Sequence, residues 1–431
     1  SNSAGLMGKN NKSLPARTDL EVVANNGLLH RRLFFKQVAA TGATLALPLA
    51  AADNLVTPPW MQKPGLPFSN YGQPSKQVKT IRRITANRVV AGNGSSWTPL
   101  DELEGMITPN GLHFERHHNG MPEIEAAQHQ LLIHGLVKQP LKFSYADLLR
   151  YPMTSKMIFI ECGGNSFSGW HHEPLQTSAG NLHGLASCSE WTGVPLSVLL
   201  NETGIDTKAS WVIAEGADAI AHNMSLPLEK LMDDAIIALY QNGERLRPEN
   251  GFPMRLIVPG WEGVLNVKWL RRLEVSNQPI MSRNETSQYT ELLPSGKARQ
   301  FTFVMEAKSL ITSPSQGYKL RAPGFYEISG LAWSGRGKIA KVEVSADGGK
   351  TWGVAALQGP VLAQCFTRFR MGWNWNGKPA ILKSRATDET GYVQPERKVL
   401  IQERGRHGYF HYNGIVAWEV DDDGSITHVY A

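Results

Sequence analysis

The chain has 431 residues, of which 42% are hydrophobic and 19% charged, and it contains 41 glycines and 25 prolines. This length suits two or three domains with ample core, and the composition excludes a disordered chain or a long coiled coil. Residues 1–50 hold six basic and two acidic side chains, so +4 of the net charge of +6 lies there and +2 remains for the rest. Because no long basic run is left, the charge pattern argues against nucleic-acid binding.

Residues 1–52 are predicted to be a targeting segment. Arg31 and Arg32 precede apolar residues and Lys36, and a weakly apolar, Ala-rich run over 38–52 follows. This run is too short and too interrupted to span a bilayer. The order is typical of a twin-arginine signal peptide. We therefore expect a periplasmic protein that is exported folded, with a cofactor already bound. The alternative to a signal peptide is that the basic segment around Arg31 and Arg32 is the start of a solvent-exposed helix.

Residues 53–300 are expected to form a mixed α/β domain. The part up to about residue 108 is rich in Pro, Gly, Asn and Ser, which indicates extended loop. Ser144 and Asp147 have capping-box spacing at the start of a helix. The predicted strands are 131–133, 156–160, 256–258 and 267–275, and the predicted helices are 144–149 and 195–200. No GxGxxG follows a strand, so a nucleotide-binding Rossmann domain is not supported.

Residues 301–431 are expected to form an immunoglobulin-like β-sandwich, which makes the fold class α+β. Residues 341–345 alternate with period two, and Asp347-Gly348-Gly349 supplies a turn before the chain resumes at Thr351. Further strands are predicted at 367–371, 380–386, 398–401 and 414–420. About seven short strands in roughly 120 residues with few helix signals fit such a sandwich.

Cys162 is the strongest candidate for chemistry. It follows the predicted strand 156–160 and opens a Gly-Gly-Asn turn, where glycines let a bulky ligand approach the backbone. A thiolate is a soft ligand for a metal. A buried free cysteine without function is the alternative, and that interpretation is favoured for Cys188 and Cys365. With three cysteines, at least one thiol is free.

Three cationic segments are candidates for binding an anion. Arg116 stands beside histidines, and its permanently charged guanidinium suits an anionic ligand. Arg255 and Lys268 each lie among Gly, Pro and aromatic residues and could hold a phosphate; isolated surface cations are the alternative. Zinc binding by His113, His117 and His118 is also conceivable, although nothing nearby completes such a site.

Together these segments resemble the sulfite oxidase family of molybdenum enzymes. The similar segments occur in the family's order, over roughly residues 100–420. They are Thr108-Pro109-Asn110 through Arg116-His117-His118, Cys162-Gly163-Gly164-Asn165, Gly251-Phe252-Pro253-Met254-Arg255, Pro259-Gly260, Val267-Lys268-Trp269-Leu270, residues 347–352 and Val393-Gln394-Pro395. The resemblance implies a molybdopterin-binding catalytic domain over 53–300 and a dimerisation domain over 301–431.

The resemblance also implies roles for individual residues. Cys162 is expected to bind the metal of a molybdenum-molybdopterin cofactor. The residues expected to contact the pterin and its phosphate are Phe114, Arg116, His118, Cys162, Asp218, Asn250, Arg255, Asn266, Val267 and Lys268. The expected catalytic residues are Cys162, Arg116, Tyr289 as the active-site tyrosine, Trp191 as a pocket-lining residue, and Phe167.

Two departures from the family pattern bear on the substrate. Ser166-Phe167 and Tyr412-Asn413-Gly414 stand where the family's sulfite oxidases have arginines. Each lost cation weakens binding of a free dianion, because a charge-assisted hydrogen bond contributes about 1.5–3 kcal/mol. The resemblance then favours the branch of the family that oxidises sulfane sulfur on a carrier-protein cysteine to sulfonate. Such an enzyme passes electrons to a c-type cytochrome subunit, and no CxxCH haem motif occurs in this sequence.

The expected assembly is a homodimer of this chain within a heterotetramer, without a membrane span. Three other functions stay open. One is a periplasmic sulfite dehydrogenase that acts on free sulfite with cytochrome c as acceptor. Another is a secreted, non-catalytic binding protein that uses the sandwich. A reductase of the methionine-sulfoxide type is the third, and the C-terminal sandwich argues against it.

Overall fold

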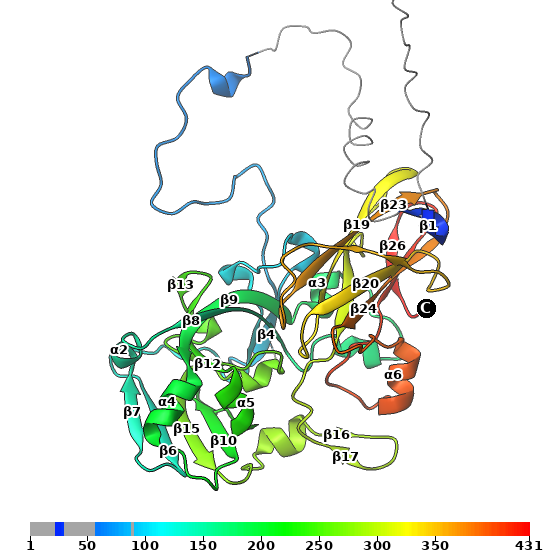
Figure 1. The fold of residues 1–431 in the computed structure, drawn as a ribbon. Helices are drawn as coiled ribbons and strands as arrows, with labels where there is room; N and C mark the ends of the chain where they lie inside the picture. Colours follow the sequence, from blue (N-terminus) through cyan, green and yellow to red (C-terminus); the bar gives the residue numbers. More distant parts are fainter. Residues whose placement is uncertain (1–21, 30–56, 88–89) are drawn as a thin grey trace, which may run out of the picture.

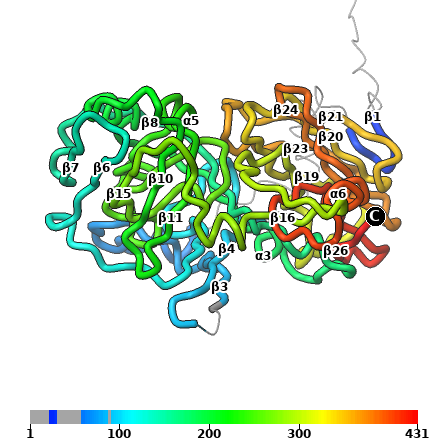
Figure 2. Tube along the Cα trace, turned by 90° about the horizontal axis from the view of Figure 1, so that it is seen from below, coloured from blue at the N-terminus to red at the C-terminus, as the bar shows by residue number. Residues whose placement is uncertain are grey.

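The computed structural model describes residues 22–29, 57–87 and 90–431, which form an α/β half and a β-sandwich lying side by side (Figure 1, Figure 2). Arg31, Arg32 and the Ala-rich run of the predicted signal peptide lie outside the described residues. Within the described part of the chain, no helix is long and apolar enough to cross a membrane.

Two five-stranded sheets form the centre of the α/β half. The first has the order β11-β10-β15-β6-β7, in which only the β15–β6 pair is parallel. In the second, β13, β12, β9 and β8 follow one another and β14 also pairs with β12. The strands are β6 (Gln130–Gly135), β7 (Leu141–Ser144), β8 (Thr154–Glu161), β9 (Ala186–Pro195), β10 (Trp211–Gly216), β11 (Asn223–Pro227), β12 (Ile236–Gln241), β13 (Glu244–Arg245), β14 (Arg255–Ile257) and β15 (Leu270–Ser276).

Short elements complete this half. A small sheet of β3 (Ile84–Asn87), β4 (Gly94–Trp97) and β5 (Glu115–His117) precedes the central sheets, and β16 (Glu291–Leu292) pairs with β17 (Ala298–Arg299) after them. The helices are α2 (Tyr145–Leu148), α3 (Ala179–His183), α4 (Leu196–Thr203) and α5 (Leu228–Asp233). The capping box of Ser144 and Asp147 is present at the start of α2, and Gly204, at φ +67°, ends α4. The capping box confirms the sequence pattern, and the glycine at the end of α4 has the left-handed conformation that commonly ends a helix.

The C-terminal half is a sandwich of two antiparallel sheets. One has the order β1-β2-β23-β19-β18, with β22 also on β23, and the other has the order β21-β20-β24-β25-β26. The strands are β1 (Val22–Ala24), β2 (Leu28–Leu29), β18 (Lys308–Ser313), β19 (Gly324–Trp333), β20 (Ile339–Ser345), β21 (Gly353–Val354), β22 (Ala356–Leu357), β23 (Thr367–Trp375), β24 (Ala380–Asp388), β25 (Ala417–Val420) and β26 (Ile426–Val429).

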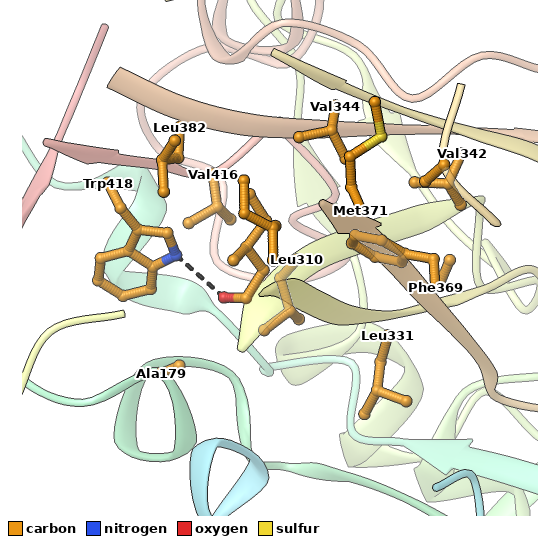
Figure 3. Close-up of a cluster of buried hydrophobic side chains, with 14 of the residues drawn as sticks. Ala179, Leu310, Leu331, Val342, Val344, Phe369, Met371, Leu382, Val416 and Trp418 are labelled. Atoms are coloured by element: carbon orange, nitrogen blue, oxygen red, sulfur yellow. Dashed lines mark hydrogen bonds between the residues drawn. The ribbon is translucent and has the colours of Figure 1, made fainter. Parts of the chain in front are cut away.

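The core between these sheets is packed by side chains of both (Figure 3). Trp418 is fully buried there, and its Nε1 donates to the carbonyl of Ile311 at 3.0 Å, the dashed line in Figure 3. The same buried cluster takes in Phe159 and Ala179 of the α/β half. One continuous apolar core therefore fixes the two halves against each other.

Two features of this half differ from the sequence predictions. Residues 398–401 do not form a strand but belong to helix α6 (Arg397–Arg404), because only Leu400 and Arg404 are buried, at helical spacing. Residues 22–29, within the predicted signal peptide of 1–52, form β1 and β2 on the sandwich.

Candidate active site

The end of β8 leads into the turn that carries Cys162. The Cys162 N–H donates to the carbonyl of Leu185 at 2.9 Å, and its carbonyl accepts from the N–H of Asn165 at 2.9 Å. The Asn165 side chain donates to Glu161 Oε1 at 3.0 Å and accepts from the Leu185 N–H at 3.1 Å. Hydrogen bonds from both sides therefore hold the thiol in one position.

Small residues let this turn lie close to the loop that follows β14. A Cβ atom on Gly163 would lie 2.7 Å from Oε2 of Glu262, and one on Gly263 would lie 3.0 Å from the carbonyl oxygen of Glu161. These approaches leave no room for a side chain at either glycine. Gly263 thereby packs against the backbone of Glu161 and Cys162, and Gly163 packs against the Glu262 carboxylate.

Two cavities meet at Cys162. We call the first the basic cavity and the second the aromatic cavity. Including their open mouths, they enclose about 680 Å³ and about 1600 Å³ of empty space. The residues that line both are Arg116, His118, Cys162 and Tyr289. A ligand atom bound to the sulfur would therefore face a group held in one cavity and a substrate entering through the other.

The basic cavity holds cations whose hydrogen-bond partners are neutral. Arg255 is 5% exposed and donates to the carbonyls of Asn266 at 3.0 Å and Asn250 at 3.2 Å. Lys268 Nζ donates to Nδ1 of His117 at 2.6 Å and to backbone carbonyls. Burial lowers the pKa of Arg255 to about 9 and also lowers the pKa of Lys268. An anion bound between them would relieve this unfavourable burial of charge.

Two histidines of the basic cavity, His117 and His222, have lowered pKa values. His118 stacks on His222 with ring centroids 5.6 Å apart. Burial lowers the pKa of His222, and burial and then Lys268 lower the pKa of His117. Neutral rings suit hydrogen bonding to a heterocycle. Among the described residues, no group of three His, Cys, Asp or Glu side chains could hold a metal ion, so the zinc interpretation of His113, His117 and His118 finds no support.

The aromatic cavity is walled by rings from both halves of the chain. Phe167 stacks on Tyr409 with centroids 5.6 Å apart, and Tyr289 lies against Phe410 at 4.8 Å. Burial, followed by the neighbouring Cys162, raises the pKa of Tyr289, so its hydroxyl stays protonated. This hydroxyl can donate a hydrogen bond to a group bound at the sulfur.

Two family models match the chain in succession. The "oxidoreductase molybdopterin binding domain" matches residues 118–284, and the "Mo-co oxidoreductase dimerisation domain" matches residues 299–416. The crystal structure of the sulfane dehydrogenase SoxCD from Paracoccus pantotrophus is 44% identical, with a TM-score of 0.85, over 89% of this chain and 100% of that chain. The chain belongs to the sulfite oxidase family of molybdopterin oxidoreductases.

Plant nitrate reductases are more distant relatives within this set of matches. The NADH nitrate reductase of Solanum lycopersicum is 31% identical over 71% of this chain and 38% of its own length. An inducible NADH nitrate reductase of Glycine max is 31% identical over 74% of this chain and 40% of its own length. This molybdopterin oxidoreductase thus spans about two fifths of the length of these relatives.

The basic cavity fits the molybdenum-molybdopterin cofactor that the family implies. Arg255 and Lys268 are cations without a carboxylate partner within ion-pair distance among the described residues, which suits a phosphate. Cys162 would supply a soft sulfur ligand at the point where the two cavities meet. Burial raises the pKa of the free thiol, so binding a metal there releases its proton.

The structure brings nearly all the predicted site residues to one place. Those that line the basic cavity are Phe114, Arg116, His118, Cys162, Asp218, Arg255, Asn266, Val267, Lys268 and Tyr289. Phe167 lines the aromatic cavity. Asn250 and Trp191 lie behind the basic cavity and both contact Arg255. The carbonyl of Asn250 accepts a hydrogen bond from Arg255. The fully buried ring of Trp191 lies with its centroid 5.4 Å from the guanidinium carbon of Arg255. Trp191 therefore supports a lining residue and does not line either cavity itself.

Several lining residues were not predicted from the sequence. His222, four residues after Asp218, lines the basic cavity, and its N–H donates to Asp218 Oδ1 at 2.9 Å. Tyr409 and Phe410 reach the aromatic cavity from the loop after α6. The spacing of Asp218 and His222 could have indicated the first of these. No local pattern marks the other two, because they meet the site only through the contact between the halves.

Proposed function

We propose that this chain is the molybdenum subunit of a periplasmic sulfane dehydrogenase. It oxidises sulfane sulfur on a carrier-protein cysteine to sulfonate and passes the electrons to a c-type cytochrome subunit. The chain forms a homodimer within a heterotetramer. The match to a dimerisation domain and the similarity to SoxCD support this assembly.

The single observation that carries the proposal is the character of the aromatic cavity. Its wall presents Trp97, Phe167, Tyr409 and Phe410 to the space next to Cys162. An open cavity of this size, with rings on one part of its wall and polar side chains on the rest, suits a peptide arm that brings a sulfur atom to the metal. A small free dianion would fill little of it.

Among the residues that the structure describes, the charges that line the same cavity are too few to select a free dianion. Arg116 is the lining arginine, and Glu291, which also lines the cavity, is paired with Arg404. Ser166, where the family's sulfite oxidases place an arginine, faces away and accepts a hydrogen bond from Lys308 at 2.6 Å. Sulfite would therefore lack the charge-assisted bonds that each contribute about 1.5–3 kcal/mol.

Each site residue then has a defined part in catalysis. Bound molybdopterin supplies two-electron oxygen-atom transfer chemistry. Cys162 fixes the metal, and Arg255 and Lys268 hold the phosphate. Arg116 attracts the negative charge that accumulates as sulfur is oxidised. The Tyr289 hydroxyl, neutral at physiological pH, donates a hydrogen bond at the junction of the cavities.

The test compares two substrates on the purified complex with its cytochrome. The wild-type enzyme is expected to oxidise carrier-bound sulfane faster than free sulfite. Phe167→Arg should raise kcat/KM for sulfite by roughly 10–100-fold, the value of one charge-assisted bond, and lower it for the loaded carrier. Leu292→Arg is the matched control, since Leu292 also lines the cavity but is 60% exposed at its rim.

Three outcomes would overturn the proposal. Rapid oxidation of sulfite by a wild-type enzyme that ignores the loaded carrier would assign the chain to the sulfite dehydrogenases. Turnover of nitrate alone would place its activity with the nitrate reductases. Absence of molybdenum from protein purified from its own host would favour a binding protein without catalysis.

A further inference from the structure

Residues 57–83 form an extended segment, the arm, that precedes β3 of the α/β half. Figure 1 shows it in blue, looping out from that half. Every residue from 61 to 80 is exposed, and the arm, all of which the structure describes, has a single helical turn at Pro59–Met61 and no strand. Its five prolines restrict the backbone to extended conformations. Ordering such a segment on a partner therefore costs little conformational entropy.

The arm exposes large apolar side chains to water. Trp60 is 76% exposed, Leu66 is 95% exposed, and Phe68 is fully exposed. The other large apolar side chains exposed on the arm are Met61, Tyr71 and Val78. Soluble proteins rarely expose so many in one short segment, and aromatic residues and methionine are enriched where proteins bind each other. These side chains are therefore expected to be covered by another chain.

The arm ends beside the two cavities. Its last residue, Arg83, pairs with Glu115 of β5 at 2.6 Å, and the next residue of β5, Arg116, lines both cavities. β3, which follows the arm, carries Ala86 at the wall of the aromatic cavity. The arm thus starts from the rim of the candidate active site.

The middle of the arm is tied to the α/β half. Lys79 pairs with Glu102 at 3.0 Å, and the Tyr71 hydroxyl donates to Oε1 of Glu244 at 3.0 Å. Both acceptors lie outside residues 299–416, which match the dimerisation domain. A second copy of the chain is expected at that domain, whereas an electron acceptor has to approach the cofactor, since electrons tunnel only over short distances. The position of the arm therefore favours the electron acceptor as its partner.

The charge of the arm indicates what its partner presents. The arm has five basic side chains and no acidic one; the basic residues are Lys63, Lys76, Lys79, Arg82 and Arg83. Among the residues that the structure describes, Lys63, Lys76 and Arg82 form no ion pair. They are available to carboxylates of a partner, and their charge would speed its association at low ionic strength. The complementary surface is acidic and contains apolar pockets.

We propose that the arm binds the electron-accepting cytochrome subunit and holds it beside the active site. This inference takes its partner from the proposed function. Trp60, Leu66 and Phe68 fill apolar pockets of the cytochrome subunit, and the unpaired cations of the arm meet its carboxylates. The arm is thus an interaction surface of the α/β half, separate from the contact between the two copies of this chain.

The first experiment is hydrogen exchange on the complex with its cytochrome, purified from its own host. Within the described chain, no amide of residues 63–74 donates a hydrogen bond. Without a partner these amides should exchange as fast as in an unfolded chain. In the complex they should exchange at least about tenfold more slowly. Exchange at the unfolded rate in the complex would overturn the proposal.

The second experiment removes the apolar anchors. Trp60→Ser and Phe68→Ser should each raise the Kd of the cytochrome subunit at least about tenfold, measured from the haem retained per molybdenum when the complex is diluted. Both side chains are exposed, so the variants should fold like the wild type. Leu175→Ser is the matched control, because Leu175 is 47% exposed elsewhere on the α/β half, and it should retain haem. Turnover with ferricyanide, a small acceptor that needs no docking, should stay within about twofold in every variant.

A charge variant tests the electrostatic part. Lys76→Glu should weaken haem retention, and more so at low than at high ionic strength. Lys208→Glu, at an exposed position of the α/β half, should leave retention unchanged. Equal retention by Lys76→Glu and Lys208→Glu at low ionic strength would contradict the role of the charge.

The remaining outcomes separate this proposal from its alternatives. Full haem retention by Trp60→Ser and Phe68→Ser would overturn it. So would light scattering that shows these variants as single copies with their haem intact, because the arm would then belong to the homodimer. None of the substituted residues lines either cavity. A complex that oxidises free sulfite instead of the loaded carrier would refute the proposed substrate and leave the haem and exchange results standing.

Discussion

Lys308 Nζ lies 2.9 Å from Glu161 Oε1, and this ion pair joins the two halves of the molecule directly behind the cysteine turn. The side chains are only 1% and 2% exposed. Lys308 also donates to Ser166 Oγ at 2.6 Å, and Glu161 Oε2 accepts from Trp333 Nε1 at 2.8 Å. The sandwich therefore holds both ends of the turn that carries Cys162.

Removing the lysine of this pair should destabilise the whole molecule. Lys308→Met leaves the Glu161 carboxylate buried without its cation, which costs about 3–5 kcal/mol of the free energy of unfolding. Urea unfolding measures this loss. Lys319→Met is the control: its pair with Asp423 is exposed, so the free energy of unfolding should stay close to that of the wild type. Equal stability of both variants would show that the buried pair does not hold the halves together.

Replacing Lys268 should have opposite effects on the cofactor-free and the loaded protein. Lys268→Met removes a desolvated cation, so the cofactor-free chain should resist urea better. The loss of one charge-assisted bond to the phosphate should raise the rate of cofactor release by roughly 10–100-fold. Unfolding of both forms and the rate of pterin loss measure the two effects. Arg271→Met, at an exposed position of β15, should change neither.

Acid should weaken the fold through His113. Burial and then Arg255 lower the pKa of His113 to about 3 in the folded protein, against 6.5 as its ordinary value. Below pH 6.5 the unfolded chain takes up a proton that the folded chain refuses. The stability that this residue contributes is therefore complete above pH 6.5 and falls by about 1.4 kcal/mol per unit towards pH 3.

The variant His113→Gln isolates this contribution. Its free energy of unfolding should fall less steeply between pH 6.5 and 5 than that of the wild type, by about that amount per unit. His171→Gln, at an exposed position, should follow the wild-type slope. Parallel slopes for His113→Gln and the wild type would show that His113 accepts a proton in the folded state.

Much of the site could be predicted because its residues stand in short, ordered motifs. Cys162 follows a recognisable buried strand, and the segments around Arg116 and Lys268 keep their cations next to residues that shape a turn. Such short motifs can be recognised in the sequence without knowledge of the fold. They pointed to Cys162 and to the cations Arg116, Arg255 and Lys268, which the structure brings together around the basic cavity.

What could not be predicted depends on contacts between distant segments. Lys308 and Tyr409 reach the site from the other half of the chain, and nothing in their own neighbourhood marks them. The run over 398–401 is apolar enough for a strand, yet tertiary packing of Leu400 selects a helix. In the sequence, residues 22–29 look like part of a signal peptide. Their contact with β23 is visible only in the folded sandwich.

Molybdenum X-ray absorption on the loaded enzyme counts the sulfur atoms bound to the metal, which tests the role of Cys162 most directly. Cys162→Ser should reduce that count by one and abolish turnover. Cys365→Ala, which changes a buried thiol outside both cavities, should leave the count and the spectrum unchanged. An unchanged sulfur count in Cys162→Ser would contradict the assignment of this residue as the metal ligand, and with it the account of the site.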